Sequence, residues 1–193
     1  MLYYSTRNSK EKVTASQAIS HGLAPDGGLY VPESLPQLTL EDIKALGKEN
    51  YRGRAFGIMK PFLDEFTKPE LKAMIARAYG DNFDSDSAAP VHFLDDNTAV
   101  LELWHGPTCA FKDMALQMLP HLLTASLKKC GEKRKVCILV ATSGDTGKAA
   151  LEGFADVENT KILVFYPHNG VSDVQQLQMV TQTGENVGVA AVR

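Results

Sequence analysis

The sequence lacks the features that mark membrane, nucleic-acid-binding and secreted proteins. No apolar run reaches the roughly 20 residues that a membrane-spanning helix needs, and the N-terminus has no basic segment followed by an apolar core. Lys and Arg number 20 against 23 Asp and Glu, a net charge of −3 without any basic tract. We therefore expect neither a nucleic acid nor a membrane surface as the main partner.

Cysteine and histidine are also sparse. The three cysteines form no Cys-x-x-Cys pair and leave one over, which favours reduced thiols and a cytoplasmic location. The five histidines show no metal-ligand spacing, so we expect no metal site. Hydrophobic residues make up 44% of the 193 positions, which is enough for a sizeable core in one or two domains.

The hydrophobic pattern changes near Gly80–Pro90, an acidic, small-residue stretch that ends in proline and is typical of a loop. Before this stretch the pattern is mostly helical, with short strands. After it, strands and helices alternate, which predicts parallel strands joined by right-handed crossovers. We predict an α/β protein with a mainly helical N-terminal domain over 1–88 and the leading part of an α/β domain over 89–193.

Local start and stop signals define the elements more closely. A continuous apolar run such as Val136–Ala141 predicts a strand that is covered on both faces. Thr67 with Glu70 forms a capping box that predicts a helix start. The other expected elements are helices over 14–21, from Thr39 to Gly47, over 51–66 with a break at Pro61, over Lys112–Cys130 with a dent at Pro120, from near Thr146, and after Ser172 or Asp173; and strands at 29–31, 91–94, 98–103, 161–166 and 186–192.

The segment Trp104–Ala115 holds the most informative residue, Lys112, where an apolar Gly-Pro loop turns into a helix. A lysine in a first helical turn is usually solvated. Positive charge is unfavourable at a helix N-terminus, however, and the tight apolar loop suits an amine that attacks a carbonyl to form a Schiff base. We expect His105 and Cys109 to be packing residues, and Asp113 to be a first-turn carboxylate favoured by the helix dipole.

A second loop, Thr142–Gly147, follows the predicted strand at its carboxyl end, where parallel sheets bind ligands. Its glycines allow close backbone approach, and its hydroxyls and the next helix N-terminus can hold an anion. The alternative is a capped turn whose hydroxyls only satisfy the helix start; the loop by itself leaves both open. A magnesium-binding P-loop is excluded, because Thr142 replaces its first glycine and Ala149 its Ser or Thr.

Together these stretches resemble threonine synthase. The motifs HGPTxAFKD at 105–113 and ATSGDTG at 141–147 are typical of that family, and YSTR at 4–7 with GLAPDGGLYVP at 22–32 agrees. Three motifs in the family order, over Tyr4–Arg193, make the resemblance specific to the long form with an extra N-terminal domain. It implies a pyridoxal 5'-phosphate (PLP) enzyme of the tryptophan-synthase-β fold type, whose PLP domain has three layers around a parallel sheet.

The resemblance implies a role for each motif residue. Lys112 would hold PLP as a Schiff base, and Phe111 would lie near the ring. Asp145 stands where related enzymes carry Asn beside the cofactor's 3′-oxygen, so an acid there departs from the pattern of the fold. The residues implied to bind the substrate's carboxylate or phosphate are Ser143, Gly144 and Thr146.

The implied reaction converts O-phospho-L-homoserine and water to L-threonine and phosphate, with Lys112 moving protons at Cα and Cβ. Two alternatives stay open: a paralogue that eliminates phosphate and releases a 2-oxo acid, and a non-catalytic binding module, which an intact Lys112 disfavours. The family's phosphate-binding glycine loop, and its hydroxyl residue facing the pyridine nitrogen, lie beyond Arg193. We therefore expect an N-terminal fragment that is inactive alone; whether it forms a homo-oligomer stays open.

Overall fold

The chain folds into two compact units, and the computed structural model describes residues 1–193. Unit 1 comprises Met1–Tyr79 and His121–Lys133, and unit 2 comprises Gly80–Pro120 and Arg134–Arg193. The chain thus passes between the units more than once. The single domain boundary between residues 88 and 89 stays a prediction.

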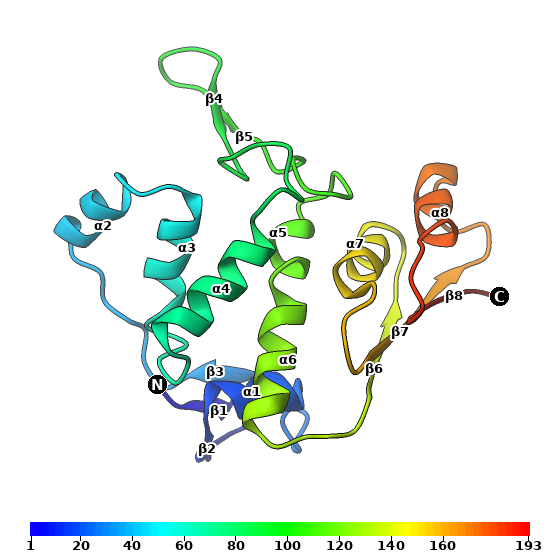
Figure 1. The fold of residues 1–193 in the computed structure, drawn as a ribbon, viewed down its shortest axis with the longest axis horizontal. Helices are drawn as coiled ribbons and strands as arrows, with labels where there is room; N and C mark the ends of the chain where they lie inside the picture. Colours follow the sequence, from blue (N-terminus) through cyan, green and yellow to red (C-terminus); the bar gives the residue numbers. More distant parts are fainter. The chain divides into compact units, whose positions relative to one another are not determined.

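Unit 1 begins with a small antiparallel sheet in the order β2-β1-β3, and a short helix lies between β2 and β3 in sequence (Figure 1). The turn before β3 requires glycine, because a Cβ on Gly28 would lie 2.1 Å from Ser5 Oγ. The sequence analysis missed β1 and β2, since β2 is polar and mostly exposed and shows no apolar period. The elements are β1 (Tyr3–Ser5), β2 (Asn8–Val13), α1 (Ala15–His21) and β3 (Tyr30–Pro32).

Helices form the rest of unit 1. The predicted capping box of α4 is confirmed, with Thr67 N donating to Glu70 Oε2 at 2.7 Å and Glu70 N donating back to Thr67 Oγ1. The core of the unit includes Phe66, Leu71 and Ile75, which are almost fully buried. The helices are α2 (Leu40–Leu46), α3 (Tyr51–Met59), which ends before Pro61, α4 (Lys68–Ala78), and α6 (Leu119–Lys129), of which the residues from His121 on belong to this unit.

The single helix predicted over Lys112–Cys130 is wrong. The chain forms α5 (Asp113–Leu116), interrupts the helix, and starts α6 at Leu119. Pro120 has no N–H to donate to the Leu116 carbonyl, so the first helix cannot continue through it, whereas the first turn of a new helix tolerates proline. The freed Leu116 carbonyl packs on Gly153, where a Cβ would lie 2.3 Å from the oxygen.

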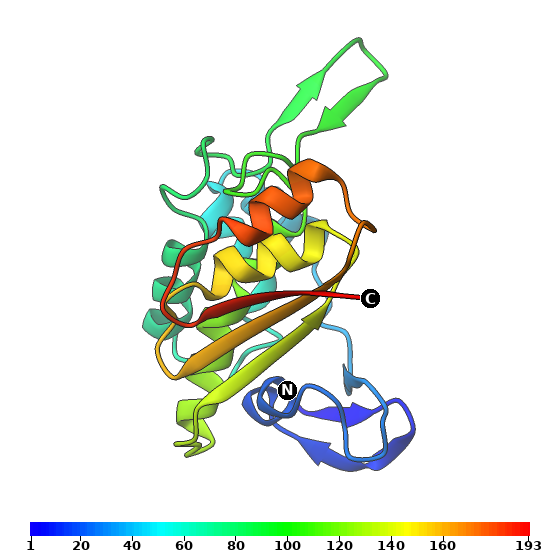
Figure 2. The ribbon, with the colours of Figure 1, turned by 90° about the vertical axis from the view of Figure 1, so that its right-hand side faces the viewer.

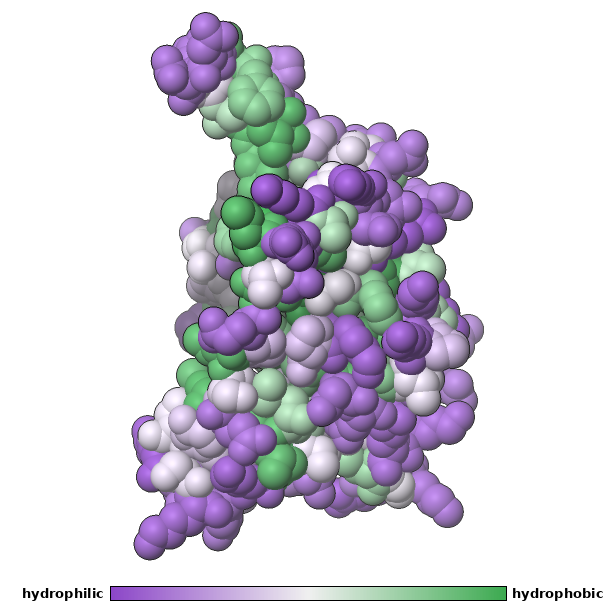
Figure 3. Space-filling view, turned by 90° about the vertical axis from the view of Figure 1, so that its left-hand side faces the viewer, coloured by the Kyte–Doolittle hydropathy of each residue, from purple (hydrophilic) through white to green (hydrophobic).

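Unit 2 contains an exposed hairpin arm made of β4 (Val91–Phe93) and β5 (Ala99–Leu101), which pair antiparallel as predicted. All three residues of β4 are exposed. Figure 3 shows the arm as apolar along its strands and hydrophilic at its tip, where the sequence has Asp95, Asp96 and Asn97.

The parallel sheet of unit 2 has the order β6-β7-β8 and carries two helices (Figure 2). Its register pairs Leu139 with Leu163, and Val164 with Val189. The predicted alternation of strand and helix is confirmed, which places the loop after β6 at the carboxyl edge of the sheet. The elements are β6 (Val136–Ala141), α7 (Asp145–Phe154), β7 (Thr160–Pro167), α8 (Asp173–Val180) and β8 (Val187–Val192).

Only one face of this sheet is covered within unit 2. Helices α7 and α8 lie along the same side of the strands in Figure 2, and the β7 residues Ile162 and Val164 are buried there. On the opposite face Leu139 is 67% exposed. The prediction that the strand Val136–Ala141 is covered on both faces is therefore wrong for this chain, because α7 and α8 both pack on the same face of the sheet.

Candidate active site

Lys112 lies at the N-cap of α5, which confirms the predicted position at the start of a helix. Its side chain is half-buried, and Nζ lies 4.1 Å from the centre of the Phe111 ring. Phe111 is 55% exposed. Nζ makes neither a hydrogen bond nor an ion pair with the chain. The amine is therefore uncommitted, next to an aromatic face and open to a ligand.

The loop before Lys112 is braced by Asp113, whose side chain is fully buried. The Asp113 carboxylate accepts hydrogen bonds from Thr108 N at 2.8 Å and from Thr108 Oγ1 at 2.7 Å. Gly106 packs on the same carboxylate, where a Cβ would be 2.6 Å from Oδ2. Asp113 does lie in the first turn of α5, but it also holds the loop that carries Lys112, which the sequence analysis did not foresee.

His105 adds a second brace to the same segment. Its Nε2 lies 2.7 Å from Glu102 Oε2, and its Nδ1 is hydrogen-bonded to Asp84, while the ring stacks on Trp104. The Glu102 and Asp84 carboxylates raise the pKa of His105 above its ordinary value, because both hydrogen bonds favour the charged imidazolium. His105 was expected only to pack; it is also an ionic bridge between two segments of unit 2.

The loop after β6 is capped by its own threonine. Thr142 Oγ1 accepts from Gly144 N at 3.1 Å and from Gly147 N at 3.0 Å. Gly147 must lack a side chain, because a Cβ there would be 2.3 Å from Thr142 Cγ2. Ser143 and Thr146 are exposed. Thr142 thus serves the capped turn, while the other two hydroxyls face solvent and stay free to meet a ligand.

Gly144 and Asp145 contact a residue that the sequence analysis did not single out, Gln175 of α8. Gly144 has a φ of 147°, and a Cβ there would lie 2.5 Å from the Gln175 side-chain amide. Gln175 Nε2 donates to Asp145 Oδ1 at 2.8 Å. Gln175 stands three residues after Ser172, which signals a capping box, but its contact with a loop 30 residues away comes only from the tertiary fold.

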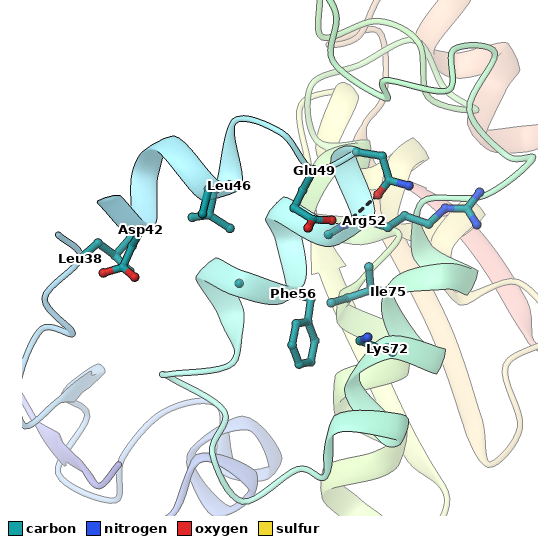
Figure 4. A pocket seen from close by; sticks show the side chains of 12 residues that line it. Leu38, Asp42, Leu46, Glu49, Arg52, Phe56, Lys72 and Ile75 are labelled. Atoms are coloured by element: carbon teal, nitrogen blue, oxygen red, sulfur yellow. Dashed lines mark hydrogen bonds between the residues drawn. The ribbon is translucent and has the colours of Figure 1, made fainter. Parts of the chain in front are cut away.

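A cavity of about 590 Å³ lies elsewhere, in unit 1. Figure 4 shows Leu46, Glu49 and Phe56 among the side chains that line it. It is lined by residues of α2, α3 and α4 and the segments beside them, and none of the predicted site residues is among them. No group of three or more His, Cys, Asp or Glu side chains is placed to hold a metal ion. No helix combines the length and apolar character needed to cross a membrane.

Known proteins match this chain over its whole length. Residues 2–79 match a family model described as the threonine synthase N terminus. The chain is 45% identical over 193 residues to the threonine synthase of Pseudomonas aeruginosa, covering 100% of this chain and 40% of the relative. It is 40% identical over 189 residues to threonine synthase-like 1 of Homo sapiens, covering 92% of this chain and 25% of the relative.

Among solved structures, the X-ray crystal structure of PLP-bound threonine synthase from Brucella melitensis matches with a TM-score of 0.91 and 41% identity, covering 99% of this chain and 41% of that one. The fold is therefore the α/β fold of the N-terminal part of such a structure, including part of its parallel sheet. The chain belongs to the threonine synthase family. It spans about 40% of the length of the threonine synthase from Pseudomonas aeruginosa.

Proposed function

We propose that this chain provides the lysine-bearing part of a PLP-dependent threonine synthase, which converts O-phospho-L-homoserine and water to L-threonine and phosphate. The observation that carries the proposal is Lys112, an uncommitted amine on a braced loop, in a chain 45% identical to a threonine synthase. The three free cysteines fit a reducing, cytoplasmic compartment.

The residues around Lys112 fit PLP. An amine without a protein partner, next to an exposed aromatic face, is free to bond an aldehyde. Lys112 would hold the cofactor covalently as a Schiff base, and, when its amine is free, move protons at Cα and Cβ of the substrate. Phe111 would lie near the ring and Asp145 near the 3′-oxygen. PLP, when bound, supplies an electron sink for the substrate's reacting carbons.

The loop after β6 fits the anionic end of the substrate. Ser143 and Thr146 offer exposed hydroxyls, and the N-terminus of α7 offers a positive dipole. At Gly144, which Gln175 covers on one side, the substrate would come close to the backbone from the other side. These three residues would bind the carboxylate or phosphate of O-phospho-L-homoserine, so that the reacting carbons are oriented toward Lys112.

A second candidate is a phospho-lyase of the same family that eliminates phosphate and releases a 2-oxo acid. The similarity to threonine synthase-like 1 of Homo sapiens supports this second candidate, because the name of that protein sets it apart from threonine synthase. Product analysis on the full-length protein distinguishes the two: threonine for the first reaction, a 2-oxo acid for the second.

The assignment of Lys112 is tested by chemical labelling. The chain is incubated with PLP, reduced with borohydride so that the lysine link becomes permanent, and digested for mass spectrometry. We expect the label on Lys112, and its loss in Lys112→Met. Lys128 is exposed and reports non-specific modification, whereas Lys148 is buried and already hydrogen-bonded. A label mainly on either of these two lysines contradicts the proposal.

The activity is tested on the full-length protein by measuring phosphate and threonine together. We expect Lys112→Ala to lower the turnover by about 10³-fold or more, since both covalent attachment and proton transfer are lost. Lys128→Ala is the matched control and should keep the parent rate. Normal turnover in Lys112→Ala would remove this lysine from the reaction.

A further inference from the structure

Asp145 is held by two side chains that the proposed function does not use. Its Oδ1 accepts from Gln175 Nε2 at 2.8 Å, and Lys148 Nζ lies 3.6 Å from the same oxygen. Lys148 Nζ also donates to Gln178 Oε1 at 2.8 Å. One oxygen of the carboxylate is therefore occupied by the protein, and Oδ2 is the oxygen that can meet a ligand.

Lys148 is an unusual residue for its place in α7. It is 8% exposed and lies beside Ala149, Ala150 and Leu151, which are buried. A charged amine in such a place is costly unless it is paired and hydrogen-bonded. The polar partners of its Nζ are Asp145 and Gln178, and Asp145 is the one that carries a charge. The two residues therefore form a pair with no net charge.

Gln175 performs two tasks with one carboxamide. Its Oε1 accepts from Ser172 N at 3.3 Å and from Ser172 Oγ at 3.2 Å, which caps α8. Its Nε2 donates to Asp145. The backbone at Gly144 closes over this amide, so closely that a Cβ would be 2.5 Å from the amide nitrogen. The direction of the Asp145 carboxylate is thus set from α8.

We propose that Gln175 and Lys148 are positioning residues for Asp145: Gln175 sets the direction of the carboxylate, and Lys148 balances its charge. The inference rests on the proposed function in taking Asp145 to lie beside the cofactor. There, a carboxylate with one oxygen already bound and its charge balanced presents a single, oriented acceptor instead of a free anion.

The variant Gln175→Glu separates capping from positioning. A glutamate at this position can still accept from Ser172, so the α8 cap survives, but it cannot donate to Asp145 and repels it. Gln176→Glu places the same charge on the next residue of α8, whose side chain is not hydrogen-bonded in the chain. Asp145→Asn combined with Gln175→Glu exchanges donor and acceptor, so the hydrogen bond between the two residues can form again. The negative charge then lies on residue 175 of α8, and Lys148 can pair with it there.

The first measurement is urea unfolding of the chain. We expect Gln175→Glu to lower the folding equilibrium constant about tenfold relative to Gln176→Glu, and the double variant to recover most of that loss, as coupled residues do. Asp145→Ala should lower the constant similarly, because it leaves the buried Lys148 amine without its carboxylate. Equal effects of Gln175→Glu and Gln176→Glu, or no recovery in the double variant, would overturn the proposal.

The second measurement is the visible absorption of the lysine-linked cofactor in the full-length protein. The double variant should have nearly parent stability but an altered absorption band, because the charge next to the cofactor has moved; a purely structural contact would leave the band unchanged, and that result overturns the positioning role. If the full-length parent protein shows no such band at all, the proposed function fails, and the unfolding data still decide whether Gln175 and Lys148 hold Asp145.

Discussion

The two loops that begin α5 and α7 are held in different ways. In the loop before α5, the brace is local: Thr108 and Asp113, which share two hydrogen bonds, are five residues apart. In the loop before α7, Thr142 caps the turn locally, but Asp145 is held by Gln175, 30 residues farther along the chain. Both loops are short and contain a tightly packed glycine, Gly106 or Gly144.

This difference separates the two sets of proposed site residues. Lys112 keeps its place as long as its own loop and the start of α5 are intact. Asp145 keeps its direction only if α8 is docked on α7. A substitution in α8 should therefore affect Asp145 and leave Lys112 unchanged, whereas a substitution in the loop before α5 should do the reverse.

The largest expected effect is that of Asp113→Ala. Removing this fully buried carboxylate leaves two donors of Thr108 unsatisfied, which we expect to cost about 3 kcal/mol in the free energy of unfolding. Asp173→Ala is the matched control, because Asp173 is also a first-turn acid but is exposed; it should cost only about 0.5 kcal/mol. Similar losses in urea unfolding would mean that Asp113 acts through the helix dipole alone.

Gly106→Ala tests the same brace from the other side. The added Cβ would meet Asp113 Cβ at 2.5 Å, so the loop must shift, at a cost of about 2 kcal/mol in unfolding free energy. Gly47→Ala serves as the control, because its backbone is helical, with a φ of −61°, and the nearest atom lies 3.4 Å from the added Cβ. That control should be neutral or slightly stabilising. A tolerated Gly106→Ala would show that the loop before α5 is not tightly packed.

Gly144→Ala sharpens the contrast between local and distant support. The substitution costs backbone strain at positive φ and displaces the Gln175 amide. Because part of the cost lies in α8, we expect it to fall by about 1 kcal/mol when the same substitution is made in a Gln175→Ala background. Thermal or urea unfolding of the four proteins in this cycle gives the coupling. An unchanged cost would assign the whole effect to the backbone of the loop.

The smallest expected effect is a pH dependence at the outer brace of the loop before α5. The pKa of His105 is raised by Glu102 and Asp84 from an ordinary value of 6.5. The stabilisation is therefore fully present below about pH 6.5 and is lost as the pH rises through the higher folded-state pKa. His105→Gln should remove this component from the pH dependence of unfolding. His168→Gln, on an exposed histidine, should leave the component in place.

Much of the fold was predictable because its signals are local. The capping box of Thr67 and the helix start at Thr39 follow from side chains that reach a backbone N–H three residues away. For α8 the sequence left Ser172 and Asp173 open, and the structure has Ser172 as the cap. The alternation of strands and helices after residue 90 follows from runs of apolar residues. The break between α5 and α6 was missed, because a proline can either bend a helix or stand in the first turn of a new one. Which of the two occurs at Pro120 depends on how the helices pack.

The sequence by itself determined which residues stand in the two loops, that Lys112 starts a helix, and that the loop after β6 lies at the carboxyl edge of a parallel sheet. These follow from motif residues and from periodicity within about 15 residues. Only the tertiary structure decided that Asp113 is a buried brace, that Gln175 and Lys148 hold Asp145, and that one face of the sheet stays uncovered in this chain. Such contacts join residues far apart in sequence, or depend on burial, and no local pattern encodes which distant side chain will meet a given carboxylate.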